Sequence, residues 1–229
     1  MARSDVPPAR RAPIRSPTIH GSRGVGTGFT LLEMLIVIVI ISILASLTMV
    51  GVTMAIRSSR ISNTELLVRN LEGALEIYKT RWGDYAPSTL RAMRISVPND
   101  TNNGIEALTA CLAGRAKGEP LLKLPSEELY GNSDDDELRS NPTNWFFGDT
   151  KLREIRDYFG GTLAYLHHRD YPSAGRDLLR YVLKPGSKPA EIKACRSGTT
   201  ATFARPAEFQ IFSAGPDGEF GSSDDIRPW

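Results

Sequence analysis

The sequence is poor in the residues that most often build catalytic or metal centres. Its 229 residues include only 3 histidines and 2 cysteines, and no Cys-x-x-Cys pair occurs. The Gly-x-Ser-x-Gly motif of many hydrolases and the Gly-rich motif that binds nucleotide phosphates are also missing. We therefore expect neither a zinc site nor an enzyme.

Charge is distributed unevenly along the chain. Residues 1–28 contain five arginines and one aspartate, a net charge of +4, whereas the whole chain has a formal net charge of +2, so residues 29–229 carry −2. The mildly acidic body gives no indication of a nucleic-acid surface. A basic flank that precedes an apolar segment is expected to stay on the cytoplasmic side of a membrane.

Charge is missing altogether from the 23 residues between Met34 and Ile56. About 20 apolar residues are enough to cross a bilayer as a helix. We predict one membrane-spanning helix here, and the simplest interpretation is a plain single-pass anchor.

Glu33 lies at the edge of this apolar run. A carboxylate in an apolar environment costs several kcal/mol unless it is neutralised or paired. If the chain were cut after Gly28, Phe29 would gain an α-amino cation four residues before Glu33. The carboxylate could then pair with its own terminus or with that of a neighbouring subunit, which would couple charge neutralisation to assembly.

The string G-F-T-L-L-E, followed by the apolar run, resembles the class III signal of type IV pilins and type II secretion pseudopilins. The resemblance implies that prepilin peptidase cuts between Gly28 and Phe29, that the same enzyme N-methylates Phe29, and that Glu33 aids subunit docking. Residues 1–28 would be a cytoplasmic basic leader that is removed. This leader is longer than is usual in the family.

The helix is expected to continue beyond the membrane. Residues 29–56 would form the transmembrane, polymerising half and residues 57–82 an amphipathic half, ended by Gly83. Apolar or semi-apolar residues recur there at alternating spacings of three and four, which predicts one buried stripe. The stripe comprises Ile61, Thr64, Val68, Leu71, Leu75, Tyr78 and Trp82.

Residues 83–229 are expected to form a periplasmic globular α+β domain. We predict a short helix over 102–114, mostly loop over 121–151, and strands at 162–166 and 208–213. A long N-terminal helix packed on a small antiparallel sheet is the predicted fold class.

The landmarks of this part resemble, in order, the major (G-type) pseudopilin of type II secretion. They are the tyrosine at 85, the segment GIEAL, the segment DYFGGTLAY and a closing acidic loop. The stretches near 117–151 and 171–202 look like insertions relative to the family pattern.

The closing loop contains three aspartates among glycines: Asp217, Asp224 and Asp225. Carboxylates and backbone carbonyls are ligands that Ca²⁺ prefers, and glycines let a loop fold tightly around an ion. Chemistry alone leaves a solvated turn equally open. The resemblance favours structural calcium, with these three side chains as ligands and backbone oxygens near Ala214 and Ser222.

Three further features of the sequence have simple structural interpretations. Asp134, Asp135, Asp136 and Glu137 are expected to form a solvated loop. His167 and His168 would point to opposite faces of a strand and so would not act as a ligand pair. Cys111 and Cys195 could form a disulfide in an oxidising compartment or remain two thiols, and the sequence leaves both open.

The leading hypothesis is therefore a structural subunit of a type II secretion pseudopilus, inserted in the inner membrane and assembled into a periplasmic helical homopolymer. Implied partners are prepilin peptidase, minor pseudopilins and an inner-membrane assembly platform with its ATPase. The alternatives are a type IV pilin of a surface fibre, serving adhesion, motility or DNA uptake, and a membrane-tethered binding domain that never polymerises.

Overall fold

The structure is a computed structural model. It describes residues 28–115, 118–139, 147–171, 179–198 and 202–229. The chain forms two compact units, Met1–Thr48 and Met49–Trp229, and each is described by itself.

Helix α1 (Leu31–Trp82) is the main element of the N-terminal region. Its sequence has no proline and is rich in residues that favour helices. It ends at Gly83, which adopts a left-handed φ of 83° and donates its N–H to the Lys79 carbonyl at 2.7 Å. The predicted long helix is confirmed, but it starts at Leu31, two residues later than predicted.

In the first unit, the large apolar side chains from Leu31 to Leu47 are 43% to 92% exposed. By length and composition, α1 is the one helix among the described residues that could span a membrane. The described residues of this unit do not cover its apolar surface.

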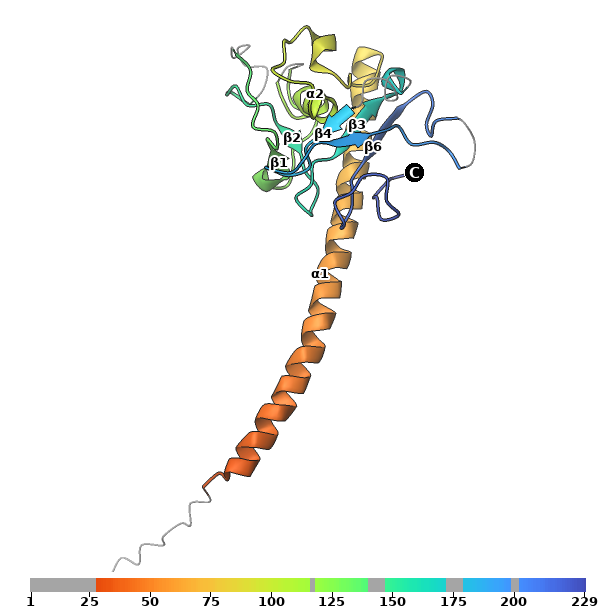
Figure 1. Cartoon of the computed structure of the whole chain (residues 1–229). Coiled ribbons are helices and arrows are strands. Elements are labelled where there is room, and N and C mark those ends of the chain that lie inside the picture. Colours follow the sequence, from red (N-terminus) through yellow and green to blue (C-terminus); the bar gives the residue numbers. More distant parts are fainter. Residues whose placement is uncertain (1–27, 116–117, 140–146, 172–178, 199–201) are drawn as a thin grey trace, which may run out of the picture. The chain divides into compact units, whose positions relative to one another are not determined.

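In the second unit, α1 buries one stripe. Val68, Leu71 and Leu75 are fully buried, and they share one core with α2 and with strands β3 and β6. The prediction fails at the end of the stripe, because Trp82 is 37% exposed and stacks on Tyr78 with a centroid distance of 4.3 Å. Figure 1 shows the C-terminal part of α1 beside these elements.

Helix α2 (Asn103–Leu112) lies within the predicted segment, and all ten of its residues are buried. Gly104 permits its close approach to the sheet. A β-carbon at this position would lie 2.2 Å from the Tyr165 carbonyl oxygen and 2.5 Å from the Tyr181 hydroxyl.

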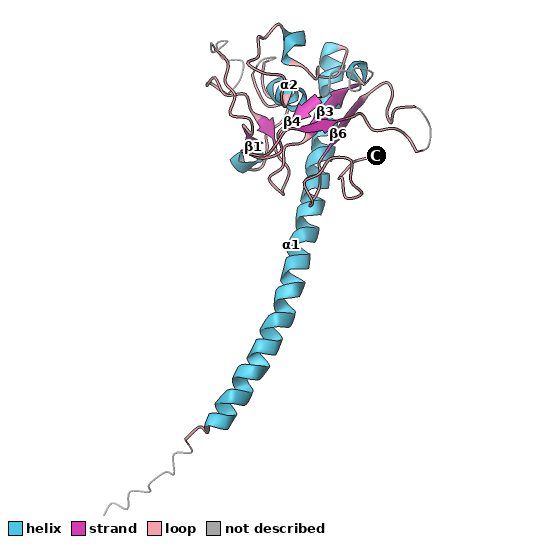
Figure 2. Ribbon diagram, viewed as in Figure 1, coloured by secondary structure: helices cyan, strands magenta, loops and turns pink. Residues whose placement is uncertain are grey.

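Among the described residues, the strands, drawn in magenta in Figure 2, form three antiparallel pairs. They are β1 (Tyr130–Gly131) with β2 (Glu154–Ile155), β3 (Ala164–His167) with β6 (Phe209–Phe212), and β4 (Leu179–Tyr181) with β5 (Ala190–Ile192). In the central pair every residue is buried, and the register joins Ala164 to Phe212 and His167 to Phe209.

The part of this unit that the structure describes also contains three 3₁₀ helices: η1 (Leu90–Met93), η2 (Glu127–Leu129) and η3 (His168–Asp170). The fold is α+β, as predicted. Strand β6 falls inside the predicted segment, whereas β3 starts two residues later than predicted, because Thr162 pairs with Arg156 in an isolated antiparallel bridge and not with β6. The hairpin of β4 and β5 lies in a stretch for which no structure was predicted.

Candidate functional sites

The acidic C-terminal loop is closed by an antiparallel bridge. Ser213 and Ile226 exchange two backbone hydrogen bonds of 3.1 and 3.0 Å, which brings the ends of the loop together. Gly215 has a φ of 67°, and a β-carbon there would lie 2.2 Å from the Asp224 carbonyl oxygen. A side chain therefore cannot replace this glycine without opening the loop.

The three aspartates of this loop bind groups of the loop itself. The backbone N–H of Asp217 donates to Asp224 Oδ2 at 3.2 Å, and the N–H of Gly221 donates to Asp225 Oδ2 at 3.0 Å. The Ser222 hydroxyl donates to Asp224 and lowers the pKa of that carboxyl. Arg227 pairs with Asp225 Oδ2 at 2.5 Å.

The donor set of the loop fits a hard cation in part. Asp225 Oδ1 is buried and accepts no hydrogen bond from any described residue. The three carboxylates, all of them described, are not among the groups whose ligand atoms lie within 4.8 Å of one another. An ion bound by all three would have to displace some of the internal bonds, and the predicted carbonyls of Ala214 and Ser222 would have to turn towards it.

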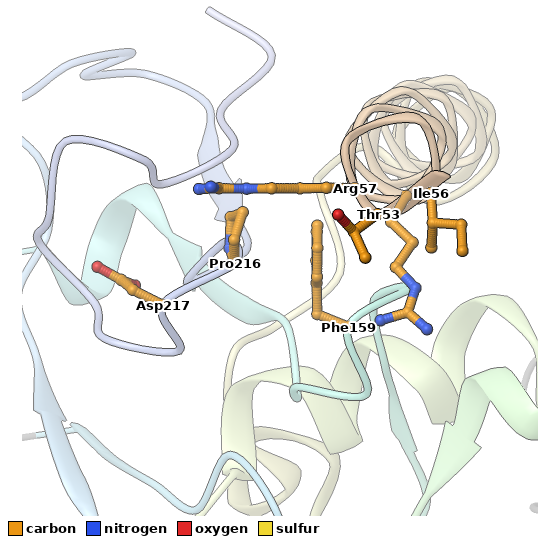
Figure 3. Close-up of a pocket in the computed structure, with 7 residues that line it drawn as sticks. Thr53, Ile56, Arg57, Phe159, Pro216 and Asp217 are labelled. Atoms are coloured by element: carbon orange, nitrogen blue, oxygen red, sulfur yellow. The ribbon is translucent and has the colours of Figure 1, made fainter. Parts of the chain in front are cut away.

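A groove of about 440 Å³ runs between this loop and α1, lined by Thr53, Ile56, Arg57, Arg60, Phe159, Pro216 and Asp217. Figure 3 shows the Arg57 side chain extending from α1 across Pro216 towards the loop that carries Asp217. Arg57 Nη2 lies 4.0 Å from Asp224 Oδ2, with the arginine side chain 63% exposed. Such a contact contributes little stability, but it places positive charge next to the acidic loop.

The second acidic segment contradicts its predicted character. Asp135 and Glu137 are exposed, but Asp136 is buried and Asp134 is half-buried. Asp136 and Asp134 turn inwards to meet Glu106 of α2. The interpretation of this segment as a solvated loop is wrong, because Asp134 and Asp136 face inwards while only Asp135 and Glu137 face solvent.

The histidine and cysteine interpretations also changed. Strand β3 ends at His167 and η3 begins at His168, so the two rings do not point to opposite faces, and their centroids lie 4.3 Å apart. Cys111 and Cys195 are not joined by a disulfide, and Cys111 Sγ lies 3.7 Å from Met93 Sδ. Both sulfurs belong to the main core or pack against it.

The start of α1 is fixed by a reciprocal pair of side chains. Thr30 Oγ1 accepts the backbone N–H of Glu33 at 3.2 Å, while Glu33 Oε2 accepts the backbone N–H of Thr30 at 2.9 Å. The Thr30 hydroxyl also donates to Glu33 Oε2 at 2.8 Å. This is a capping box, which satisfies N–H groups that the first helical turn leaves unpaired. The sequence T-L-L-E could have predicted it.

The bond between Gly28 and Phe29 lies just outside this cap. Gly28 to Thr30 form no regular secondary structure, and Phe29 is 73% exposed. The predicted cleavage point is thus an accessible, non-helical peptide bond next to the first turn of α1. Phe29 and Glu33 both lie at the N-terminal end of α1, and the side-chain bonds of Glu33 are to Thr30.

Residues 27–49 match the family model described as the prokaryotic N-terminal methylation motif. The chain carries a prepilin-type methylation motif. This match supports a type IV pilin-like or pseudopilin precursor that is processed by prepilin peptidase and assembled in a membrane. No curated protein and no solved structure matches the chain.

The methylation motif includes the whole capping box and most of the uncharged part of α1. Its carboxylate, the predicted assembly residue Glu33, is therefore held at the helix start before processing. The motif and the exposed apolar helix agree with a membrane-anchored, single-pass protein.

Proposed function

We propose that this pilin-like precursor matures into a major pseudopilin-type subunit of a type II secretion pseudopilus. The observation that supports the proposal is the methylation motif on an apolar helix that the chain leaves uncovered. Such a helix requires lipid before assembly and other copies of itself after assembly. The small α+β domain with an acidic closing loop, which resembles the G-type subunit, favours the pseudopilus.

Processing would change the electrostatics around Glu33. In the precursor, the carboxylate accepts a bond from the Thr30 N–H, the second residue after the scissile bond. Cleavage after Gly28 turns the amide nitrogen of Phe29 into a cationic amine. The carboxylate then has a cation within its own first turn or on a neighbouring subunit, which lowers the cost of keeping it in an apolar environment.

Two substitutions at Glu33 separate capping from charge pairing. Glu33→Gln keeps an oxygen that can accept the Thr30 N–H but removes the charge, and Glu33→Ala removes both. If charge pairing drives docking, both variants are cleaved and accumulate unassembled in the membrane. Thr30→Ala, which weakens the cap and keeps the charge, serves as the control and should still assemble.

Cross-linking in membranes and recovery of filaments measure the outcome. Assembly of Glu33→Gln at the unsubstituted level would show that the cap alone matters and would refute the docking role of the charge. Membrane insertion without filaments or cross-links, for the unsubstituted chain and for every variant alike, would favour a tethered domain that does not polymerise.

Deletion of the gene, followed by complementation, tests the choice of filament. A pseudopilus subunit predicts that folded secreted proteins accumulate in the periplasm and that complementation restores their export. Loss of surface fibres, motility or DNA uptake, with export intact, would instead identify a surface pilin.

We also propose that the acidic loop binds one calcium ion as a structural ligand, held by Asp217, Asp224 and Asp225. The buried, unpartnered Oδ1 of Asp225 supports this proposal. Asp224→Asn should lower calcium affinity by at least tenfold and reduce subunit assembly, as measured by calorimetry and filament recovery with the full chain in detergent. Unchanged calcium affinity in this variant would refute calcium binding by the C-terminal loop.

A further inference from the structure

Three acidic side chains from distant parts of the sequence meet inside the second unit. Glu106 comes from α2, whereas Asp134 and Asp136 come from the loop between β1 and β2. One carboxylate oxygen of each lies within 4.8 Å of one from each of the others. Figure 1 shows α2 beside β2, and the two elements are in contact. We call these three residues the inner acidic cluster.

The cluster is shielded from solvent and incompletely bonded. Glu106 is 1% exposed and Asp136 is 6% exposed. Each member has one buried oxygen, namely Glu106 Oε1, Asp134 Oδ1 and Asp136 Oδ1, without a hydrogen-bond partner among the described residues. Native structures rarely leave such atoms unsatisfied, because each one loses its hydration without compensation.

The groups around the cluster donate hydrogen bonds to the other carboxylate oxygens of Asp134 and Asp136, but not to these three unpartnered oxygens. Asn99 Nδ2 donates to Oδ2 of Asp134 at 3.0 Å and to Oδ2 of Asp136 at 3.3 Å. A fourth carboxylate, Glu154, has both oxygens bonded to the Ser133 N–H and also accepts from the Asn102 amide. The two amides and this backbone N–H carry no net charge to offset the carboxylates.

No described lysine or arginine forms a salt bridge with the cluster or with Glu154. The nearby Arg156 instead donates to the Ser133 hydroxyl at 3.2 Å. The described residues therefore bring three carboxyl groups together without a cationic side chain that could neutralise them.

We propose that Glu106, Asp134 and Asp136 bind a divalent cation of the calcium type. The ligand atoms are all carboxylate oxygens, with no nitrogen or sulfur donor in the cluster, which is the chemistry of a hard cation. Two oxygens bound to one Ca²⁺ ion are at most about 5 Å apart, since each bond is about 2.3–2.6 Å, and the observed spacing meets this limit. Mg²⁺ is smaller and demands a more regular octahedron.

This site is separate from the acidic C-terminal loop and does not depend on the pilus function. Its role follows from its position, because an ion there would join α2 to the β1–β2 loop. The cation would therefore hold the loop over residues 132–138 against the helix.

Calcium binding to the full chain in detergent, stripped of metal beforehand, tests the proposal. Calorimetry should give one bound Ca²⁺ fewer for Glu106→Gln and for Asp136→Asn than for the unsubstituted chain. Glu137→Gln, at an exposed neighbour, and Asp224→Asn, in the C-terminal loop, should both retain the inner ion. An unchanged number of bound ions in both cluster variants would overturn the proposal.

Thermal unfolding separates an ion site from a merely structural cluster. In chelator, Glu106→Gln should melt at or above the temperature of the unsubstituted chain, since it removes one of several uncompensated charges. Added Ca²⁺ should raise the melting temperature of the unsubstituted chain by more than that of the variant. A variant that melts lower in chelator and shifts equally with Ca²⁺ would contradict the proposal.

Hydrogen exchange of the unsubstituted chain provides a measurement that needs no variant to fold. At a calcium concentration of about one hundred times Kd, amides of residues 132–138 that exchange only from the ion-free form should slow about a hundredfold. Protection confined to residues 214–226 would assign calcium to the C-terminal loop alone and would refute the inner site.

Discussion

The two halves of α1 have similar helical backbones and opposite surroundings. From Leu31 to Leu47 every large apolar side chain is exposed, whereas in the second half Val68, Leu71 and Leu75 are completely buried. The first half is apolar on all faces, whereas the second half buries one stripe and leaves other faces, including Leu66 and Ile77, exposed. A stripe can be covered by one domain of the same chain, but a helix that is apolar all round requires lipid or several neighbours.

The comparison shows where the stability of the second unit and the assembly of the subunit each originate. The second half of α1 is a core element, tied to the domain by apolar packing and by polar contacts. The residues of α1 that belong to the core lie between Leu67 and Tyr78. Substitutions in the two halves should therefore separate unfolding from assembly.

The largest expected effect comes from the buried stripe. Leu71→Ala should lower the free energy of unfolding by about 2–5 kcal/mol, because it leaves a cavity in the core. Leu66→Ala, one turn earlier and 58% exposed, should change it by less than about 0.5 kcal/mol. Denaturant unfolding of the full chain in detergent, followed by tryptophan fluorescence, compares the two. Equal losses would show that the stripe is not the core face.

A polar contact between α1 and the segment before β6 should have a smaller effect. Arg205 pairs with Glu72 and with Glu208, and its guanidinium lies 4.7 Å from the centroid of the Phe209 ring. Both side chains of the first pair are only 21–22% exposed. Glu72→Gln should lower the free energy of unfolding by about 1 kcal/mol, and Glu65→Gln, on the exposed face, should hardly change it. An equal decrease in the unfolding free energy of both variants would show that the contact between Glu72 and Arg205 contributes no stability.

The contact of His167 with Asp84, just beyond the end of α1, should make the free energy of unfolding weakly dependent on pH. His167 Nε2 donates to Asp84 Oδ1 at 3.3 Å, and burial lowers the pKa of His167 below the ordinary value. Asp84, His168 and Asp170 are the charged or titratable groups that act on it. Because the unfolded chain binds the proton more tightly, the contribution of His167 is complete above about pH 6.5 and is lost as the pH falls below it.

Urea unfolding at about pH 7.5 and about pH 5.5 measures this contribution. His167→Gln should lose less stability between the two values than the unsubstituted chain does. A variant that loses as much would assign the dependence to other groups.

The smallest effect on unfolding is expected in the first half of α1. Leu44→Ala, at a residue that is 57% exposed, should leave the unfolding free energy of the second unit within about 0.5 kcal/mol. Filament recovery should nevertheless fall, since this surface packs against other copies in the proposed assembly. A clear loss of domain stability would contradict the division between the halves.

The sequence predicted the features that depend on local pattern. The apolar periodicity predicted α1 and its buried stripe, and Gly83 marked its end correctly. The short helix α2 was predicted from its flanking Asn and Gly residues. Each of these features depends on interactions within a few turns of one helix.

Features that depend on contacts between distant segments were missed. The hairpin of β4 and β5 has short strands without a clear alternation, so its pairing depends on the tertiary context. Asp136 meets Glu106 across 30 positions of sequence, which no local pattern records. The capping box of Thr30 and Glu33, in contrast, is a local pattern that T-L-L-E predicts, although the prediction made for Glu33 concerned only its charge.

The mass of the mature N-terminus tests the central claim most directly. Chain purified from membranes of cells with an active prepilin peptidase should begin at Phe29 and carry one N-methyl group. Chain from cells without the peptidase should retain residues 1–28. A mature chain that still contains Arg23 to Gly28 in the presence of the active enzyme would contradict the account.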